Sequence, residues 1–355
     1  MPEIRISSWN VNGIRSYIFN NKPSAKFKTI DAIDPESNLQ QLLDESDSNV
    51  ICFQETRCGM EKMDKIKIPG WNIYHASSEG EGGRGKDRYS GVAIMIKQAF
   101  GQPEGVIVNL PTLVEPLDLN GRDREGRFIA LDYGDYIIIN TYVPNAGTNF
   151  TYRTQRWDQA MLEYLTSLNE LGKRVIWVGD MNIARTPYDL CIGNVRTSPK
   201  GKRLLETLQT KIKSVSDSEE INKLTSETEE NLQLMQLLLN ETPYMKGIDE
   251  KSPAGFTFDE RNDFENIINA GFTDGWRHLH PEAKFKGSTW WNLRVPSYRQ
   301  LDMGWRIDYV VINNQFIDSL TECRVLNKIG EKTKLLESIK KYGSDHCPIF
   351  AVITF

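Results

Sequence analysis

Five short polar clusters along the chain contain the residue types that hydrolysis of a phosphate ester requires. They are centred on Asn10 with Asn12, on Glu55, on Tyr142 with Asn145, on Asp180 with Asn182, and on Asp345 with His346. Acids, amides, a phenol and an imidazole, without a serine or cysteine nucleophile among them, are typical of metal-assisted attack of water. The chain is therefore expected to be an enzyme.

Strand-like runs stand directly before most of these clusters. The chain has nine such runs: Ile4–Trp9, Val50–Phe53, Trp71–Ala76, Gly91–Ile96, Phe128–Asp132, Tyr136–Val143, Arg174–Val178, Ile307–Ile312 and Pro348–Ile353. Polar groups at the ends of neighbouring strands meet at one edge of a sheet, where binding and catalytic residues gather. Several runs are continuously apolar, which indicates sheets covered on both faces.

Helical periodicity lies between the runs, at Leu39–Leu43, Thr154–Leu171 and Asp263–Ala270. Strands that alternate with helices, together with hairpin-like strands at 128–143, predict mixed sheets arranged in layers. Gly179 is expected to let the backbone turn sharply after the strand that precedes it.

Residues 196–253 differ from the rest of the chain in composition. A basic stretch with leucines on one helical face precedes an acidic stretch that ends in Leu232–Leu239. We interpret the segment as a helical hairpin inserted at a surface loop, which either packs on itself or serves as a substrate lid or a docking element for a partner. Residues 214–250 hold nine acids and two lysines, so the formal charge of −5 leaves +2 for the remainder, and a polyanionic substrate is not excluded.

The carboxylates offer a metal ligand and a base. Glu55 follows a strand and is a hard oxygen ligand of the kind that Mg²⁺ prefers. Asp180 follows a buried strand and can accept a proton from water, while the amide of Asn182 orients the water or the phosphate.

The imidazole and the phenol suit phosphate binding. Because Asp345 and His346 are adjacent, one side chain can reach a metal while the other faces the substrate. A carboxylate partner, for which Asp308 is the candidate, would keep His346 charged. Tyr142 and Asn145 can donate hydrogen bonds to phosphate oxygens as negative charge builds.

Tryptophans and arginines gather in the last quarter of the chain, at Trp290, Trp291, Arg294, Arg299, Trp305 and Arg306. Aromatic rings among guanidinium groups suit stacking on sugars or bases beside phosphate contacts. At least one of the rings is expected to pack in the core.

The bulk composition is that of an ordinary soluble protein, with 39% hydrophobic and 26% charged residues among 355. No segment approaches the ~20 apolar residues of a membrane span, and the N-terminus has no signal-peptide core. Five cysteines form no C-x-x-C pair, which is typical of a reducing compartment. An intracellular protein is expected, nuclear in a eukaryote and otherwise cytoplasmic.

Taken together, these residues resemble the exonuclease III-type apurinic/apyrimidinic (AP) endonucleases of the endonuclease/exonuclease/phosphatase superfamily. The matching segments are Ser8–Arg15, Gln54–Thr56, Tyr89–Ala93, Asn140–Asn145, Gln155–Trp157, Gly179–Asn182, Gly255–Thr257, Asp274–His278, Gly304–Tyr309 and Gly343–Pro348. The resemblance implies one domain over residues 1–355, with a helical insertion at about 196–253. Its fold would be a DNase I-like, four-layer α/β sandwich, in which two mixed β-sheets pack face to face and are flanked by helices.

The resemblance also implies a metal site. Glu55 would be the main Mg²⁺ ligand, with Asn12 and Asp345 completing the site and Mn²⁺ able to substitute. Asn10, grouped with the substrate-binding residues, would support the site by hydrogen bonding. Some relatives have aspartate where Asn12 stands.

Further roles follow from the same resemblance. They are water activation by Asp180 with Asn182, phosphate binding by Tyr142, Asn145 and His346 oriented by Asp308, and a pocket for an extruded base-free sugar formed by Trp290, Trp305 and Ile307. An abasic nucleotide flips out of the duplex at low cost because it has no base to unstack.

The implied activity is Mg²⁺-dependent hydrolysis of the phosphodiester 5′ to an abasic site in duplex DNA, leaving a 3′-hydroxyl. Exonuclease activity in the 3′→5′ direction and clearing of blocked 3′ ends would use the same centre. A monomer without membrane contact is expected, with a protein partner possible at the 196–253 hairpin.

Two alternatives stay open. The same fold could serve a phosphatase or phosphodiesterase acting on a lipid or inositol phosphate, against which the tryptophan–arginine group argues. A non-catalytic DNA-binding scaffold could act through the hairpin, against which the full set of ionisable residues argues.

Overall fold

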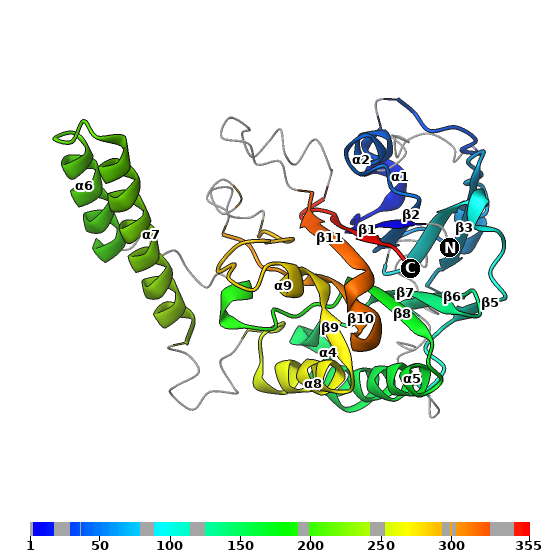
Figure 1. Cartoon of the computed structure of the whole chain (residues 1–355). Helices are drawn as coiled ribbons and strands as arrows, with labels where there is room; N and C mark the ends of the chain where they lie inside the picture. The colour runs from blue at the N-terminus through cyan, green and yellow to red at the C-terminus, as the bar shows by residue number, and fades with distance from the viewer. Residues whose placement is uncertain are drawn as a thin grey trace.

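The computed structural model describes residues 3–17, 29–35, 37–78, 89–113, 125–190, 199–241, 253–292, 299, 303–326 and 344–355. Two six-stranded sheets pack face to face, and helices cover their outer faces (Figure 1). The predicted four-layer sandwich of two mixed sheets is confirmed.

The first sheet has the strand order β11-β12-β1-β2-β4-β3. Its strands are β1 (Ile4–Asn10), β2 (Val50–Gln54), β3 (Trp71–Ala76), β4 (Val92–Lys97), β11 (Leu320–Val325) and β12 (Ile349–Ile353). At its centre β1 and β2 run parallel, and the pairs on either side of them are antiparallel.

The second sheet has the order β5-β6-β7-β8-β10-β9. Its strands are β5 (Gly105–Val108), β6 (Phe128–Asp132), β7 (Tyr136–Tyr142), β8 (Arg174–Asp180), β9 (Phe272–Asp274) and β10 (Asp308–Asn313). Here β7 and β8 are the parallel pair, and β10 returns antiparallel to β8. In both sheets, therefore, the ends of a parallel pair lie beside the start of an antiparallel neighbour.

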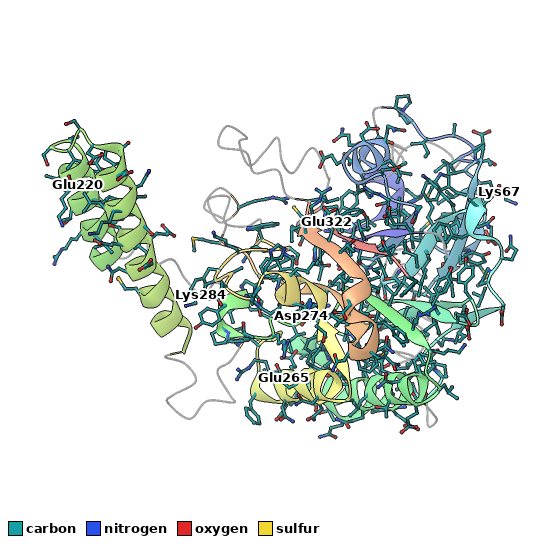
Figure 2. The ribbon with its side chains drawn as sticks, viewed as in Figure 1. Lys67, Glu220, Glu265, Asp274, Lys284 and Glu322 are labelled. Atoms are coloured by element: carbon teal, nitrogen blue, oxygen red, sulfur yellow. The ribbon has the colours of Figure 1, made fainter. Side chains whose placement is uncertain are left out.

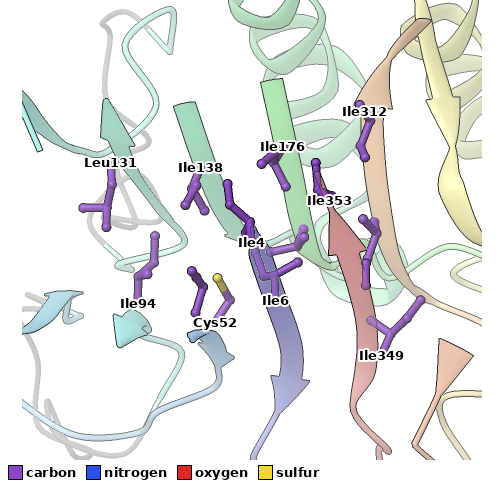
Figure 3. Close-up of a cluster of buried hydrophobic side chains, with 14 of the residues drawn as sticks. Ile4, Ile6, Cys52, Ile94, Leu131, Ile138, Ile176, Ile312, Ile349 and Ile353 are labelled. Atoms are coloured by element: carbon purple, nitrogen blue, oxygen red, sulfur yellow. The ribbon is translucent and has the colours of Figure 1, made fainter. Parts of the chain in front are cut away.

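The main core lies between the two sheets and is built mostly of isoleucine and valine, whose branched side chains pack well on a pleated surface. Figure 3 shows Leu131 and Ile138 of the second sheet near Ile94 and Cys52 of the first, and Ile176 near Ile4 and Ile353. Burial raises the pKa of the Cys52 thiol, as expected for a cysteine that fills the core. The described cysteines Cys52, Cys58, Cys323 and Cys347 are buried.

Three longer helices close the outer faces. Helix α2 (Asn38–Ser46), capped by Ser37, covers the first sheet. Helices α5 (Asp158–Glu170) and α8 (Phe258–Asn269) pack on the second sheet, and α8 begins with a capping box between Thr257 and Glu260. The shorter helices are α1 (Ile14–Tyr17), α3 (Met60–Met63), α4 (Ala146–Tyr152) and α9 (Gly275–Leu279). A π-helical turn, Arg153–Trp157, joins α4 to α5.

The predicted insertion contains two packed helices, α6 (Pro199–Ile212) and α7 (Ser218–Glu241). This α6–α7 hairpin projects from the sandwich in Figure 1, α7 contacts the turn Pro187–Asp189, and Glu220 lies near the tip of the hairpin in Figure 2. The remaining parts of the predicted insertion, 196–198 and 242–252, lie outside the described residues, as does Arg294. None of the described helices has the length and hydropathy to span a membrane.

All nine predicted runs form strands, but the expected turn at Gly179 is wrong. Strand β8 continues through Asp180, and Gly179 has a φ of +147° within it. A Cβ at this position would lie 2.0 Å from the carbonyl oxygen of Thr141 in the paired strand β7. Glycine is needed here because two backbones approach closely, not because the chain turns.

Candidate active site

A pocket of about 360 Å³ opens where the strand ends meet. Its lining comes from both sheets and from the segment that follows the insertion: Glu55, Tyr142, Asn145, Asp180, Asn182, Ala254, Gly255, Trp290, Trp305, Ile307, Asp345 and His346. A larger pocket of about 640 Å³ lies beside β3 and contains none of the predicted residues. Most of the predicted site residues thus share one wall, and Asn10, Asn12 and Asp308 do not line it.

Strand register explains this convergence. The parallel pairing of β7 with β8 places Tyr142 opposite Asp180, and the antiparallel pairing of β8 with β10 places Asp308 opposite Asp180. In the other sheet, Asn10 ends β1 opposite Gln54, the residue before Glu55. Residues more than a hundred positions apart in the chain therefore become neighbours.

A buried polar layer beneath the pocket fixes the two sheets relative to each other. Gln54 Nε2 donates to Asn140 Oδ1 at 2.7 Å and to Ser8 Oγ at 3.0 Å. Asn140 Nδ2 donates to the carbonyl oxygens of Phe53 and Ala93 at 3.0 and 2.9 Å. Because buried polar groups are stable only when paired, this layer favours one register between the sheets.

Asn10 connects the carboxylates of Glu55, the predicted metal ligand, and Asp180, the predicted base. It is fully buried, and its Nδ2 donates to Glu55 Oε1 at 3.0 Å and to Asp180 Oδ2 at 2.9 Å. The amide therefore supports Glu55 and Asp180 from behind, without forming part of the pocket surface.

Several pocket-side residues have left-handed backbones. The φ angles are 48° at Asn12, 48° at Glu55, 47° at Arg57 and 49° at Asn182. Such values are uncommon for residues other than glycine, and strained backbone of this kind clusters at functional sites. At Glu55 the conformation follows directly after β2 and turns the carboxylate into the pocket.

Glu55, Asp345 and Asn12 offer the hard oxygen atoms that suit Mg²⁺. The two carboxylates face the same pocket, and Asn12 Nδ2 lies 3.3 Å from Asp345 Oδ1. Glu55 Oε2 also accepts hydrogen bonds from Arg57, with the Nε atom at 2.8 Å. The donor set fits a hard divalent cation.

A second group, Asp180, Asp308 and His346, has ligand atoms that all lie within 4.8 Å of one another. His346 Nδ1 lies 2.8 Å from Asp308 Oδ2, the predicted partner, and Nε2 lies 3.8 Å from Asp180 Oδ2. Burial lowers the pKa of His346, but the carboxylates of Asp308 and Asp180 outweigh it and raise that pKa to about 10. A charged imidazole is a poor metal ligand and a good phosphate partner. Of the two groups, the oxygen atoms on the Glu55 side therefore suit a hard cation better.

Asp180 has the protonation behaviour of a base. Burial raises its pKa to about 7, His346 opposes the rise, and Asp308 adds to it. The backbone N–H of Asn182 donates to Asp180 Oδ1 at 2.9 Å and fixes the carboxylate. A carboxylate whose pKa lies near neutrality suits general-base catalysis.

Tyr142 and the paired amides form the other side of the pocket. Tyr142 is half-buried, and its hydroxyl donates to Glu55. Burial and the nearby Glu55 raise the pKa of Tyr142 well above 10, so it stays a donor. Asn145 Nδ2 donates to Asn182 Oδ1 at 3.1 Å, and Asn182 Nδ2 donates to the Val143 carbonyl at 2.8 Å.

Arg153, in the π-helical turn, holds the two active-site loops together. Its Nη1 donates to the carbonyl oxygen of Pro144 at 2.8 Å and to that of Met181 at 3.0 Å. Its Nε lies 2.7 Å from both carboxylate oxygens of Asp158. Pro144 stands between Tyr142 and Asn145, and Met181 stands between Asp180 and Asn182, so one buried guanidinium aligns both segments.

We predict that Arg153→Met destabilises the fold by about 3–5 kcal/mol, because it leaves Asp158 as an unpaired buried charge. Urea unfolding followed by circular dichroism measures the change. The double variant Arg153→Met with Asp158→Asn removes the unpaired charge and is expected to recover part of the loss. A single variant as stable as the parent would show that this pair does not support the site.

The apolar wall consists of Trp290, Trp305 and Ile307. The two indole rings meet edge to face, with centroids 5.8 Å apart, and Trp290 Nε1 donates to Asp345 Oδ2 at 3.0 Å. Gly255 has a φ of +85°, and a Cβ there would lie 3.0 Å from the Asn182 carbonyl oxygen and 3.3 Å from Trp305. Only glycine lets this segment close the wall without pushing on both neighbours.

Sequence reasoning did not identify three arginines that touch the site. Arg57 pairs with Glu55, Arg153 joins the two loops, and Arg127 stacks on the ring of Tyr142. The signal for Arg57 was its position two residues after Glu55. The other two had no signal, because sequence does not tell a buried arginine from a surface one.

Comparison with known proteins identifies the family of the chain. Residues 7–346 match the Endonuclease/Exonuclease/phosphatase family. A DNA-(apurinic or apyrimidinic site) endonuclease from Dictyostelium discoideum is 26% identical, over 99% of this chain and 71% of its own length. An exodeoxyribonuclease from Bacillus subtilis (strain 168) is also 26% identical, over 99% of each chain.

Solved structures share the fold. An AP endonuclease from Leishmania major superposes with a TM-score of 0.64 at 21% identity, covering 99% of this chain and 88% of that one. A 3′-5′ exonuclease from Neisseria meningitidis superposes with a TM-score of 0.60 at 20% identity, covering 99% and 100%. Because the family match runs over nearly the whole sequence, the chain belongs to the Endonuclease/Exonuclease/phosphatase family.

Proposed function

We propose that this chain is a DNA-repair phosphodiesterase that uses Mg²⁺ to hydrolyse the phosphodiester 5′ to an abasic site in duplex DNA, leaving a 3′-hydroxyl. One observation carries the proposal: a base, a charged imidazole and a pair of oxygen ligands line a single pocket beside an apolar wall. The names of the relatives, AP endonuclease and exodeoxyribonuclease, support it. Exonuclease activity and clearing of blocked 3′ ends use the same centre.

In the proposed reaction Asp180 accepts a proton from water, whose oxygen attacks phosphorus as the bond to the 3′-oxygen breaks. The charged ring of His346 and the donors Tyr142 and Asn145 hold the non-bridging oxygens. Glu55, Asp345 and Asn12 would hold Mg²⁺, which would supply neutralisation of the negative charge that develops during hydrolysis, and Mn²⁺ has the same ligand preference.

Lesion recognition is assigned to the apolar wall. Trp290, Trp305 and Ile307 lie beside the phosphate-binding groups and offer a small surface to an extruded sugar that has no base. A nucleotide with its base attached is larger and costs more to unstack.

A substrate panel tests the proposal. The protein is incubated with a duplex that carries one abasic analogue, the matching intact duplex and a soluble inositol phosphate, each with and without Mg²⁺. We expect a single cut 5′ to the analogue, only with Mg²⁺. Turnover of the inositol phosphate with the abasic duplex left uncut would assign the pocket to the other branch of the family.

We further propose that residues 1–355 form one domain that acts as a monomer; residues from both sheets of one sandwich line the pocket. Its work on DNA places it in the nucleus of a eukaryote and in the cytoplasm of a prokaryote. The α6–α7 hairpin, which projects from the sandwich and contacts it at Pro187–Asp189, is the proposed docking element for a protein partner.

Removal of the hairpin tests that assignment. Replacing residues 199–241 with a short Gly-Ser linker is expected to leave cleavage of the abasic duplex within about twofold of the parent, because none of the described side chains of α6 and α7 lines the pocket. Steady-state kinetics provide the measurement. A large rise in KM would instead make the hairpin part of the DNA-binding surface.

A further inference from the structure

Arg127 is a buried cation that contacts the lining residue Tyr142, and the proposed reaction assigns it no step. It is 4% exposed and precedes β6. Its guanidinium lies over the ring of Tyr142, with 4.6 Å between its carbon and the ring centroid, and over that of Tyr89 at 5.5 Å. A cation that close to a ring face attracts the ring electrons, and the attraction is larger where water is excluded.

Hydrogen bonds fix the guanidinium in this place. Nε donates to Glu125 Oε2 at 2.5 Å, Nη2 donates to the Tyr89 hydroxyl at 2.8 Å, and Nη1 donates to the carbonyl oxygen of Tyr142 at 3.2 Å. The backbone N–H of Tyr142 in turn donates to the carbonyl oxygen of Arg127 at 2.9 Å. Arg127 therefore contacts both the backbone and the aromatic ring of Tyr142.

The turn that carries Arg127 is itself fixed against the first sheet. Gly126 has a φ of +63°, and a Cβ there would lie 2.5 Å from the carbonyl oxygen of Ala76 at the end of β3. Only glycine permits this approach. The turn cannot shift without moving the sheet edge beside it.

These contacts form part of a closed cycle of residue contacts that also includes Glu55. The Tyr142 hydroxyl donates to Glu55, and Glu55 pairs with Arg57. The backbone N–H of Arg57 donates to the carbonyl oxygen of Ser90, which follows Tyr89, and Tyr89 returns to Arg127. This cycle of contacts crosses from one sheet to the other beside the pocket.

We propose that Arg127 is a positioning residue, which holds the phenol of Tyr142 beside Glu55 at the place where a phosphate oxygen must be met. The inference rests on the phosphate-binding role of Tyr142 in the proposed function. Without the stacked guanidinium the ring tilts and its hydroxyl loses alignment, while the binding surface for the rest of the DNA is unchanged.

A double-mutant cycle on the abasic duplex tests this role, with Arg127→Met, Tyr142→Phe and the two combined. Arg127→Met is expected to lower kcat about 10- to 100-fold, as small misplacements of a catalytic group do, with KM within about twofold. Tyr142→Phe is expected to lower kcat by about 10²-fold. In the Tyr142→Phe background, Arg127→Met is expected to cost almost nothing further, because its effect passes through the missing hydroxyl.

The controls separate this inference from the proposed function. Arg174→Met removes another stacked arginine, over Phe316 and Phe355, and is expected to leave kcat unchanged. Arg127→Lys keeps a cation beside Glu125, so it serves the same cycle if the methionine variant does not fold. Full activity of Tyr142→Phe would remove the role of Tyr142 and this inference with it. If Tyr142→Phe lowers kcat, and Arg127→Met lowers it further by the same factor in that background as in the parent, the positioning role of Arg127 is overturned and the proposed function is not.

Discussion

Asp180→Asn is expected to lower the rate of cleavage of an abasic duplex by about 10³-fold or more at neutral pH, because the amide cannot accept a proton from water. The fold should tolerate the change, since Asn is isosteric and Asn10 and Asn182 remain beside it. Single-turnover kinetics with excess enzyme measure the chemical step directly. Asp132→Asn, in a pair with Lys173 that lines no part of this pocket, serves as the matched control.

The same residue predicts a pH dependence. Since only ionised Asp180 can act as the base, the rate is expected to rise with pH as Asp180 loses its proton, and to level off above about pH 7. A bound divalent cation can only lower the pKa of Asp180, so the rising limb of the pH–rate profile, whose midpoint marks that pKa, lies at or below about pH 7. The charge of His346 also lowers it, so His346→Gln is expected to move the limb to higher pH. A limb that moves to lower pH, or a rate insensitive to pH between 5 and 8 in both proteins, would contradict the assignment of the base.

Removal of the divalent cation is expected to have an effect of similar size. Treatment with EDTA should lower turnover by about 10³-fold or more, and added Mg²⁺ or Mn²⁺ should restore it. Glu55→Gln should raise the concentration of Mg²⁺ needed for half-maximal activity, because a neutral amide is a weaker ligand than a carboxylate. Isothermal titration with Mg²⁺ provides a readout that does not depend on turnover.

Two outcomes would contradict the metal assignment. Full activity in EDTA would remove the need for a cation. Loss of Mg²⁺ binding in Asp308→Asn but not in Glu55→Gln would move the cation to the group formed by Asp180, Asp308 and His346. Glu265→Gln controls for a general loss of negative charge, because it removes a carboxylate of α8 that pairs with Arg185.

The sheets could be predicted because most of their central strands are fully buried. Runs such as Val50–Gln54 and Ile349–Ile353 are apolar at nearly every position, and such runs leave few alternatives to a central strand. The site could be predicted for a related reason. Acids and amides that follow such strands have little choice of direction once the strands lie side by side.

Three of the four edge strands, β5, β9 and β11, could not be predicted in the same way. Strand β9 has three residues, and β5 has four, of which Val106 and Val108 are exposed. In β11 the register shifts between Leu320 and Glu322, and the irregularity breaks the alternation on which a strand prediction depends. Short or irregular strands are defined by the neighbour they pair with, which the local sequence does not contain.

The residues that support the site could not be predicted from the local sequence either. Asn140 was visible only as part of a motif, yet it bridges the two sheets beneath the pocket. Arg127 and Arg153 are buried because the loops around them supply carbonyl oxygens and carboxylates. Burial of a cation depends on partners from distant segments, so it becomes visible only when those segments are placed together.

The most direct test uses a duplex with one natural abasic site, cleaved in water enriched in ¹⁸O with Mg²⁺ present, followed by mass spectrometry of both fragments. Direct attack of water on phosphorus puts the label into the 5′-phosphate of the abasic fragment and leaves an unlabelled 3′-hydroxyl on the other. A cut on the 3′ side of the lesion by elimination, or a phosphate without label, would show that these carboxylates and this imidazole do not perform the hydrolysis assigned to them.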